Sequence, residues 1–128
     1  MGEKINNFTD LNAWKEGHKL VLGIYSLVQK FPKNEQFGLS SQIERAAVSI
    51  TSNIAEGFSR YYFKDKMRFY YMARGSVSEV QNLLIIAKDL DYIKEDLFGG
   101  LFDLCKSTQS LINGLIKSIS NQTDKLSP

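Results

Sequence analysis

Apolar residues recur along this chain at steps of three and four positions, which is the spacing of the buried face of an α-helix. The pattern returns four times and predicts helices over about residues 10–31, 41–60, 63–90 and 94–120. No segment alternates apolar and polar residues over a useful length, as a half-buried strand would. Four helices with short connections favour an all-α fold, an antiparallel up-and-down four-helix bundle. We expect it to form a single domain over residues 1–128, with a polar tail at 121–128.

Each predicted helix carries one main apolar stripe that we expect to face the core. These stripes are Leu11, Trp14, His18, Val21, Tyr25 and Val28; Ile43, Ala47, Ile50, Ile54 and Gly57 or Phe58; Tyr70, Ala73, Val77, Val80, Leu84 and Ala87; and Leu97, Leu101, Leu104, Thr108, Leu111 and Leu115. Thr9 or Asp10 can cap the first helix, and Ser41 with Glu44 has the spacing of a capping box for the second.

Three helices carry a second apolar stripe beside the first. Its members are Leu20, Ile24, Leu27 and Phe31; Phe69, Met72, Leu83, Ile86 and Leu90; and Phe98, Phe102, Cys105, Ile112 and Ile116. A single bundle core needs about three apolar positions in seven, so part of this surface is left over. An apolar surface of that size usually marks association, and we expect copies of the chain to bind one another. The alternative is wide packing inside a monomer.

The second helix is unusual because residues 45–57, RAAVSITSNIAEG, are mostly small and uncharged. Small residues let a neighbouring backbone approach closely, so this helix is expected to pack on both sides. The candidate members of a structural polar network are Arg45, Asn53, Glu56, Ser76 and Glu79. We expect Arg45 or Asn53 to meet Glu79 or Glu56, since an unpaired buried charge is costly. A rival interpretation treats Glu56 and Glu79 as an acid–base pair in a catalytic cleft.

Charge is distributed unevenly although the net charge is only +2. Residues 60–74 hold five bases against one acid, whereas residues 88–106 hold five acids against three bases. In the basic segment, aromatic side chains alternate with the candidate nucleic-acid-binding residues, which are Arg60, Lys64, Lys66, Arg68 and Arg74. Aromatic planes and cations together suit single-stranded or looped RNA, because bases stack and phosphates are neutralised. The alternative is a solvated basic start of the third helix.

Candidate chemistry is sparse. The single cysteine, Cys105, cannot form an internal disulfide, and the single histidine, His18, cannot build a metal site. We interpret Cys105 as a buried apolar residue and His18 as a core or interface residue, and we predict no enzymatic activity, cofactor or metal. The longest apolar run, residues 83–87, is far shorter than the roughly 20 residues of a membrane span. With no secretory signal at the N-terminus, these features predict a cytoplasmic protein without a membrane partner.

Three stretches, taken in order, carry a family resemblance: FTDLNAW at 8–14, FPKNEQFGLSSQIERAAVSITSNIAEG at 31–57 and ARGSVSE at 73–79. Together they resemble the bacterial four-helix-bundle proteins encoded by intervening sequences in 23S ribosomal RNA genes. The similarity runs from about Phe8 to about Ile119. The chain is also similar to the accessory variability determinant of diversity-generating retroelements, a basic pentamer that works with a reverse transcriptase and RNA.

The resemblance implies a bundle that assembles as a homopentamer with a central channel. No catalytic residue follows from it. The number five comes from the resemblance, since the residues themselves indicate only self-association. One departure is the YYF at 61–63, where family members usually carry a small polar residue and several bases. The resulting interpretation is a non-enzymatic, homo-oligomeric scaffold that binds RNA or an RNA-associated protein. The alternative is a protein-binding adaptor with no nucleic-acid role.

Overall fold

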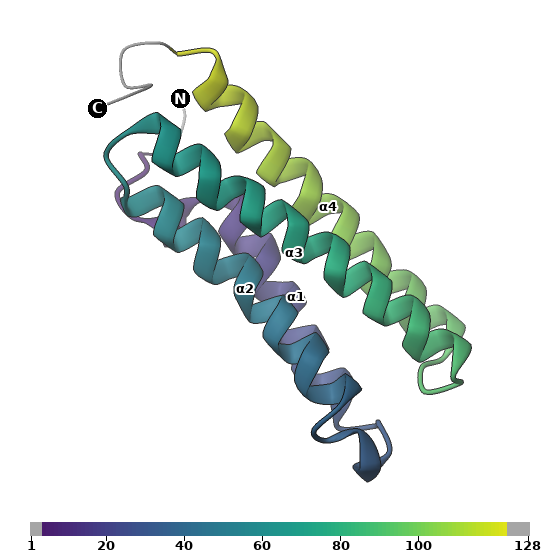
Figure 1. Cartoon of the computed structure of the whole chain (residues 1–128). Coiled ribbons are helices and arrows are strands. Elements are labelled where there is room, and N and C mark those ends of the chain that lie inside the picture. The colour runs from purple at the N-terminus through teal and green to yellow at the C-terminus, as the bar shows by residue number, and fades with distance from the viewer. Residues whose placement is uncertain (1–3, 123–128) are drawn as a thin grey trace.

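The computed structural model describes residues 4–122 and contains four long helices. In chain order the elements are the short 3-10 helix η1 (Phe8–Asp10), α1 (Asn12–Val28), the 3-10 helix η2 (Lys33–Glu35), α2 (Leu39–Ser59), α3 (Phe63–Asp89) and α4 (Glu95–Ser120). The helices lie side by side and run alternately up and down, with α2 and α3 in front of α1 and α4 in Figure 1. Within residues 4–122 there is no strand, so the prediction of an all-α, four-helix fold is confirmed. Most of the polar tail predicted at 121–128 lies outside the described residues.

The helix ends lie within three residues of the predicted positions. The largest difference is at the end of α1, which stops at Val28 because the next amides bond three residues back. Both capping predictions are wrong. Asn7 caps η1, and α1 starts after Leu11 without a side-chain cap. The helix α2 starts too early for Ser41 to cap it, and the amide of its first residue, Leu39, donates instead to Glu35 Oε1 at 3.0 Å.

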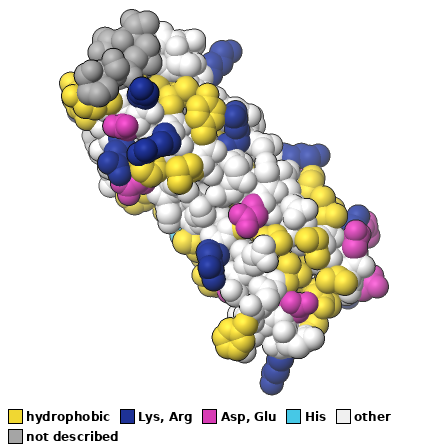
Figure 2. All heavy atoms as spheres, in the orientation of Figure 1, with side chains coloured by type: hydrophobic (Ala, Val, Ile, Leu, Met, Phe, Trp, Pro, Cys, Tyr) yellow, Lys and Arg dark blue, Asp and Glu magenta, His cyan; other side chains and the backbone are white. Residues whose placement is uncertain are grey.

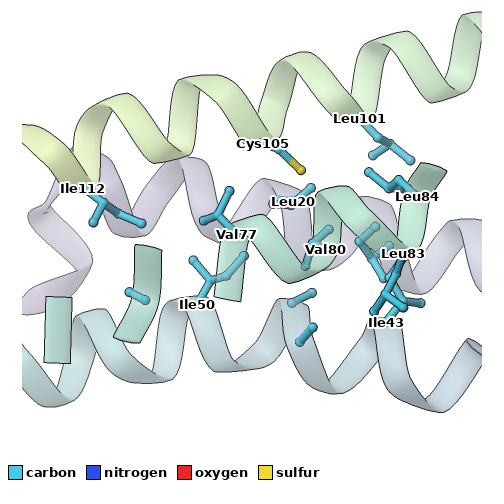
Figure 3. Close-up of a cluster of buried hydrophobic side chains, with 14 of the residues drawn as sticks. Leu20, Ile43, Ile50, Val77, Val80, Leu83, Leu84, Leu101, Cys105 and Ile112 are labelled. Atoms are coloured by element: carbon cyan, nitrogen blue, oxygen red, sulfur yellow. The ribbon is translucent and has the colours of Figure 1, made fainter. Parts of the chain in front are cut away.

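The inner faces of α2 and α3 match the sequence pattern. Ile43, Ala47, Ile50, Ile54 and Gly57 are all buried on α2. On α3 the six residues of the main stripe, Tyr70, Ala73, Val77, Val80, Leu84 and Ala87, are buried as well. In the close-up of Figure 3, Ile50 points from α2 towards Val77, and Leu101 points from α4 towards Leu84. A single core therefore joins all four helices.

On α1 and α4 the buried faces differ from the predicted main stripes. The buried residues of α1 are Ala13, Gly17, Leu20, Ile24 and Leu27, so the second stripe faces the core and the first lies at its edge. His18 and Tyr25, which the sequence placed on the core stripe, are exposed. On α4 the buried line runs between the two predicted stripes through Leu101, Cys105, Thr108, Ile112, Ile116 and Ile119. An apolar arc wider than one face contains several lines of correct spacing, and the pattern cannot choose among them.

The helices α2 and α3 approach each other closely at the α2–α3 turn. A methyl group built on Gly57 would lie 2.7 Å and 2.9 Å from two ring carbons of Tyr70. Farther along the pair, the hydroxyls of Ser49 and Ser76 share a hydrogen bond of 2.9 Å across the contact. The small residues Gly57 and Ser49 of α2 thus allow close packing against α3, which is one of the two sides on which this helix was expected to pack. This packing fixes the position of the first turns of α3 at one end of the bundle.

A candidate interaction surface at the start of α3

Basic and aromatic side chains gather where α2 ends and α3 begins. The two helices are joined by Arg60, Tyr61 and Tyr62, which leaves the start of α3 folded against the end of α2. In Figure 2, Lys and Arg side chains cluster over this end of the bundle together with apolar ones. Tyr61 is the most exposed aromatic residue there, at 67%. The surface therefore combines cations and aromatic rings, the two kinds of group that residues 60–74 were expected to present to RNA.

Two of the candidate cations lie beside one aromatic ring. The guanidinium of Arg60 lies 4.8 Å from the centre of the Phe69 ring, and that of Arg68 lies 5.2 Å from the same centre. Arg60 also forms an ion pair of 2.8 Å with Glu56, one turn earlier on α2. This pair is about half exposed, so it adds little stability. Both guanidinium groups remain at the surface, but an anionic partner of Arg60 would have to compete with Glu56.

Lys66 is hydrogen-bonded to the end of α2. Its Nζ donates to the carbonyl oxygen of Phe58 at 2.7 Å and to that of Gly57 at 3.3 Å. These carbonyls belong to the last turn of α2, where a helix has unpaired acceptors and a partial negative charge. Lys66 therefore stabilises the end of α2 and is less free than its neighbours to contact a ligand.

Arg74 connects two helices. Its Nη1 donates to Asn113 Oδ1 of α4 at 3.0 Å, and its guanidinium lies 4.9 Å from the centre of the Tyr71 ring. The residue is only partly buried. It lies two turns beyond Lys66, so its charge still contributes to the basic end of the molecule.

Lys64 and Arg68 lie one turn apart on the outer face of α3. They line a shallow hollow of about 540 Å³ together with Met67, Tyr71 and Met72. The spacing of Lys64, Arg68 and Tyr71 at positions i, i+4 and i+7 could have identified this face from the sequence. Met67 was not among the predicted site residues, since a methionine at helical spacing is usual in a core.

The expected polar network forms with different partners. Asn53 Nδ2 donates to the carbonyl of Ser49 at 2.8 Å and to its hydroxyl at 3.0 Å, and that hydroxyl bonds to Ser76. The predicted contact of Arg45 or Asn53 with Glu79 or Glu56 is absent from the ion pairs and hydrogen bonds of residues 4–122. Arg45 and Glu79 are both exposed, so solvent satisfies their charges.

Arg45 and Glu79 instead line a concave surface between α2 and α3, together with Ser41, Gln42 and Ser49. Phe37, 90% exposed at its rim, was missed by the sequence analysis because it lies between predicted helices. Glu56 and Glu79, the carboxylates of the rival catalytic interpretation, occupy different surroundings: Glu56 pairs with Arg60 and Glu79 lines this concavity.

Burial or ring stacking determines the surroundings of three other titratable residues, which are Cys105, Tyr70 and His18. Burial raises the pKa of the Cys105 thiol to about 12, so the thiol is protonated and unreactive at neutral pH. Burial likewise raises the pKa of Tyr70 to about 12. His18 lies exposed and stacked on Trp14, with ring centres 4.7 Å apart. Residues 4–122 contain no group of three or more His, Cys, Asp or Glu side chains placed to hold a metal ion.

Comparison with known proteins decides the family. The sequence pattern of the family described as 23S rRNA-intervening sequence protein matches residues 9–114. The chain belongs to this family. The family resemblance of its three motifs is thereby confirmed, and the match includes α1, α2, α3 and most of α4. No curated protein matches this 23S rRNA-intervening sequence family member.

A solved structure supports the fold of this family member. It is the crystal structure of a protein with unknown function from the S23 ribosomal protein family of Bacteroides thetaiotaomicron. The two chains share 19% sequence identity with a TM-score of 0.74, over 82% of this chain and 98% of the other. At this identity the likeness shows the shared fold. Every helix in residues 4–122 falls short of the length or the apolarity that crossing a membrane requires.

Proposed function

We propose that the protein is a non-enzymatic scaffold of the cytoplasm that associates with copies of itself and binds RNA at the α2–α3 turn. The observation that carries the proposal is the combination of exposed cations and aromatic rings at one end of the bundle. Arg60 and Arg68 flank Phe69 there, and Lys64 shares a hollow with Tyr71. Cations neutralise phosphate and aromatic rings stack on bases, so the surface has both requirements of RNA binding.

Self-association is supported by apolar side chains that the four-helix core leaves exposed. Leu22 on α1 is 58% exposed, and on α3 Ile85, Ile86 and Leu90 are exposed as well. Such side chains lose water when a second copy covers them, which favours association. The family resemblance implies five copies, and light scattering of the purified protein measures the number directly.

RNA binding is tested by titrating a fluorescent, structured ribosomal RNA fragment with the protein at several salt concentrations. Each neutralised phosphate of a single strand contributes about −0.7 to the slope of log affinity against log salt. We expect the triple variant Arg60→Ala/Lys64→Ala/Arg68→Ala to lose about 2 units of this slope. A matched control is Lys30→Ala/Lys33→Ala/Arg45→Ala, which removes the same charge from exposed residues elsewhere in the sequence. We expect the control to keep the slope of the wild type.

Two outcomes would contradict the RNA proposal. One is an absence of binding at low salt. The other is an equal loss of slope in both triple variants, which would mean that net charge rather than the α2–α3 turn attracts RNA. The first outcome would favour the protein-binding adaptor, whose apolar contacts depend little on salt, and the second would remove the α2–α3 turn as the RNA site.

A further inference from the structure

The first turns of α3 carry a shallow hollow of about 540 Å³ that is widely open to solvent. Such an open surface suits part of a larger molecule better than an enclosed small ligand. All its lining residues come from one helix, at positions 64, 67, 68, 71 and 72. They occupy consecutive turns of one face, so the hollow is open along the helix.

The lining contains one part suited to an anion and one suited to a flat ring. Lys64 and Arg68 are exposed, and neither takes part in the ion pairs found in residues 4–122. Tyr71, 45% exposed, presents part of an aromatic ring, although the guanidinium of Arg74 lies 4.9 Å from its centre. Met67 and Met72 add polarizable thioethers, which make favourable contacts with aromatic rings.

These two parts correspond to the two parts of a nucleotide. A base offers an aromatic face whatever its identity, so stacking on Tyr71 is tolerant of sequence. Lys64 and Arg68, one helical turn apart, would offer cations to the phosphates on either side of such a base. A duplex hides the faces of its bases and offers mainly phosphates and groove edges. Duplex RNA would therefore contact the two cations and leave the aromatic and methionine side chains unused.

We infer that this hollow binds an unpaired nucleotide of RNA, with its base on Tyr71 and its phosphates at Lys64 and Arg68. The inference rests on the proposed function and narrows it, because it selects single-stranded over double-stranded RNA. It also gives Tyr71 a binding role that the cations do not share.

The test measures fluorescence anisotropy of labelled (rA)10, labelled (rU)10 and a labelled, G·C-rich RNA duplex with the full-length protein. We expect both single strands to bind more tightly than the duplex. Tyr71→Leu should weaken single-strand binding about tenfold and leave duplex binding unchanged, whereas Tyr71→Phe should retain the wild-type affinity. The matched control is Tyr25→Leu on α1, because Tyr25 is 44% exposed, and this variant should bind like the wild type.

The outcomes separate this inference from the proposed function. If RNA binds but Tyr71→Leu has no effect, or if the duplex binds as tightly as the single strands, the nucleotide site is wrong while RNA binding stands. If neither single strands nor the duplex bind, both proposals fail. If free AMP competes at the affinity of the oligonucleotides, the hollow is a site for free nucleotides and the assignment to RNA is overturned.

Discussion

The inner and outer faces of α3 differ in how apolar and charged side chains are distributed along the helix. Along the inner face a buried apolar side chain recurs at every turn, from Tyr70 to Ala87. The outer face changes along the helix: its first turns carry Lys64, Arg68 and Tyr71, whereas its last turns carry exposed Ile85, Ile86 and Leu90. A continuous inner face is what a bundle core requires. A divided outer face is not required by the fold, and this is why we propose it as the surface for partners.

The largest difference between the faces should appear in stability. Leu84 is fully buried on the inner face, and Ile86 is 38% exposed on the outer face two residues away. We expect Leu84→Ala to lower the free energy of unfolding by about 2–5 kcal/mol, because it leaves a cavity. Within one copy of the chain, Ile86→Ala should cost less than about 1 kcal/mol, because water already reaches the side chain there. Urea unfolding measures both values, and similar losses in the two variants would contradict the assignment of faces.

A smaller difference should appear between two helical glycines. A methyl group on Gly57 would lie 2.7 Å from the Tyr70 ring and 3.1 Å from Cβ of Phe69, whereas one on Gly75 would meet nothing within 4 Å. We expect Gly57→Ala to destabilise the protein by about 1–3 kcal/mol through overpacking. Gly75→Ala should stabilise it by about 0.5–1 kcal/mol, because alanine favours the helix.

Thermal unfolding of the two glycine variants gives the sign of each change. A stabilising Gly57→Ala would mean that α2 and α3 are not held as closely as described. A destabilising Gly75→Ala would show that a second copy of the chain packs against the bare backbone at that position.

Much of the fold could be predicted from the sequence because a helix repeats its buried face at fixed spacing. The main stripes of α2 and α3 were assigned correctly down to single residues such as Ile50 and Val77, although α3 also carries a second stripe. On α1 the sequence offered two stripes, and packing selected Leu20 and Ile24 over His18. That choice depends on the neighbouring helices, which spacing along one chain does not contain.

The candidate site was only partly predictable. The composition of residues 60–74 identified the basic, aromatic end, yet it did not separate structural cations from accessible ones. Lys66 bonds to carbonyls at the end of α2 because the turn folds α3 back onto that end. The partners of Asn53 and Glu56 were likewise set by local geometry, since each bonds within one turn of its own helix. Such short-range alternatives compete with the long-range pairs that the sequence analysis expected.

The most direct test of the account compares Lys64→Met with Lys66→Met, two variants that remove the same charge within two positions of α3. Both the free energy of unfolding and the salt dependence of RNA binding are measured for each. We expect Lys66→Met to lose about 1 kcal/mol of stability, because the end of α2 loses its cation, and to keep the salt slope. Lys64→Met should keep its stability and lose about 0.7 of the slope, one phosphate contact. The account is contradicted if the two effects are exchanged, or if both variants change stability and RNA binding alike.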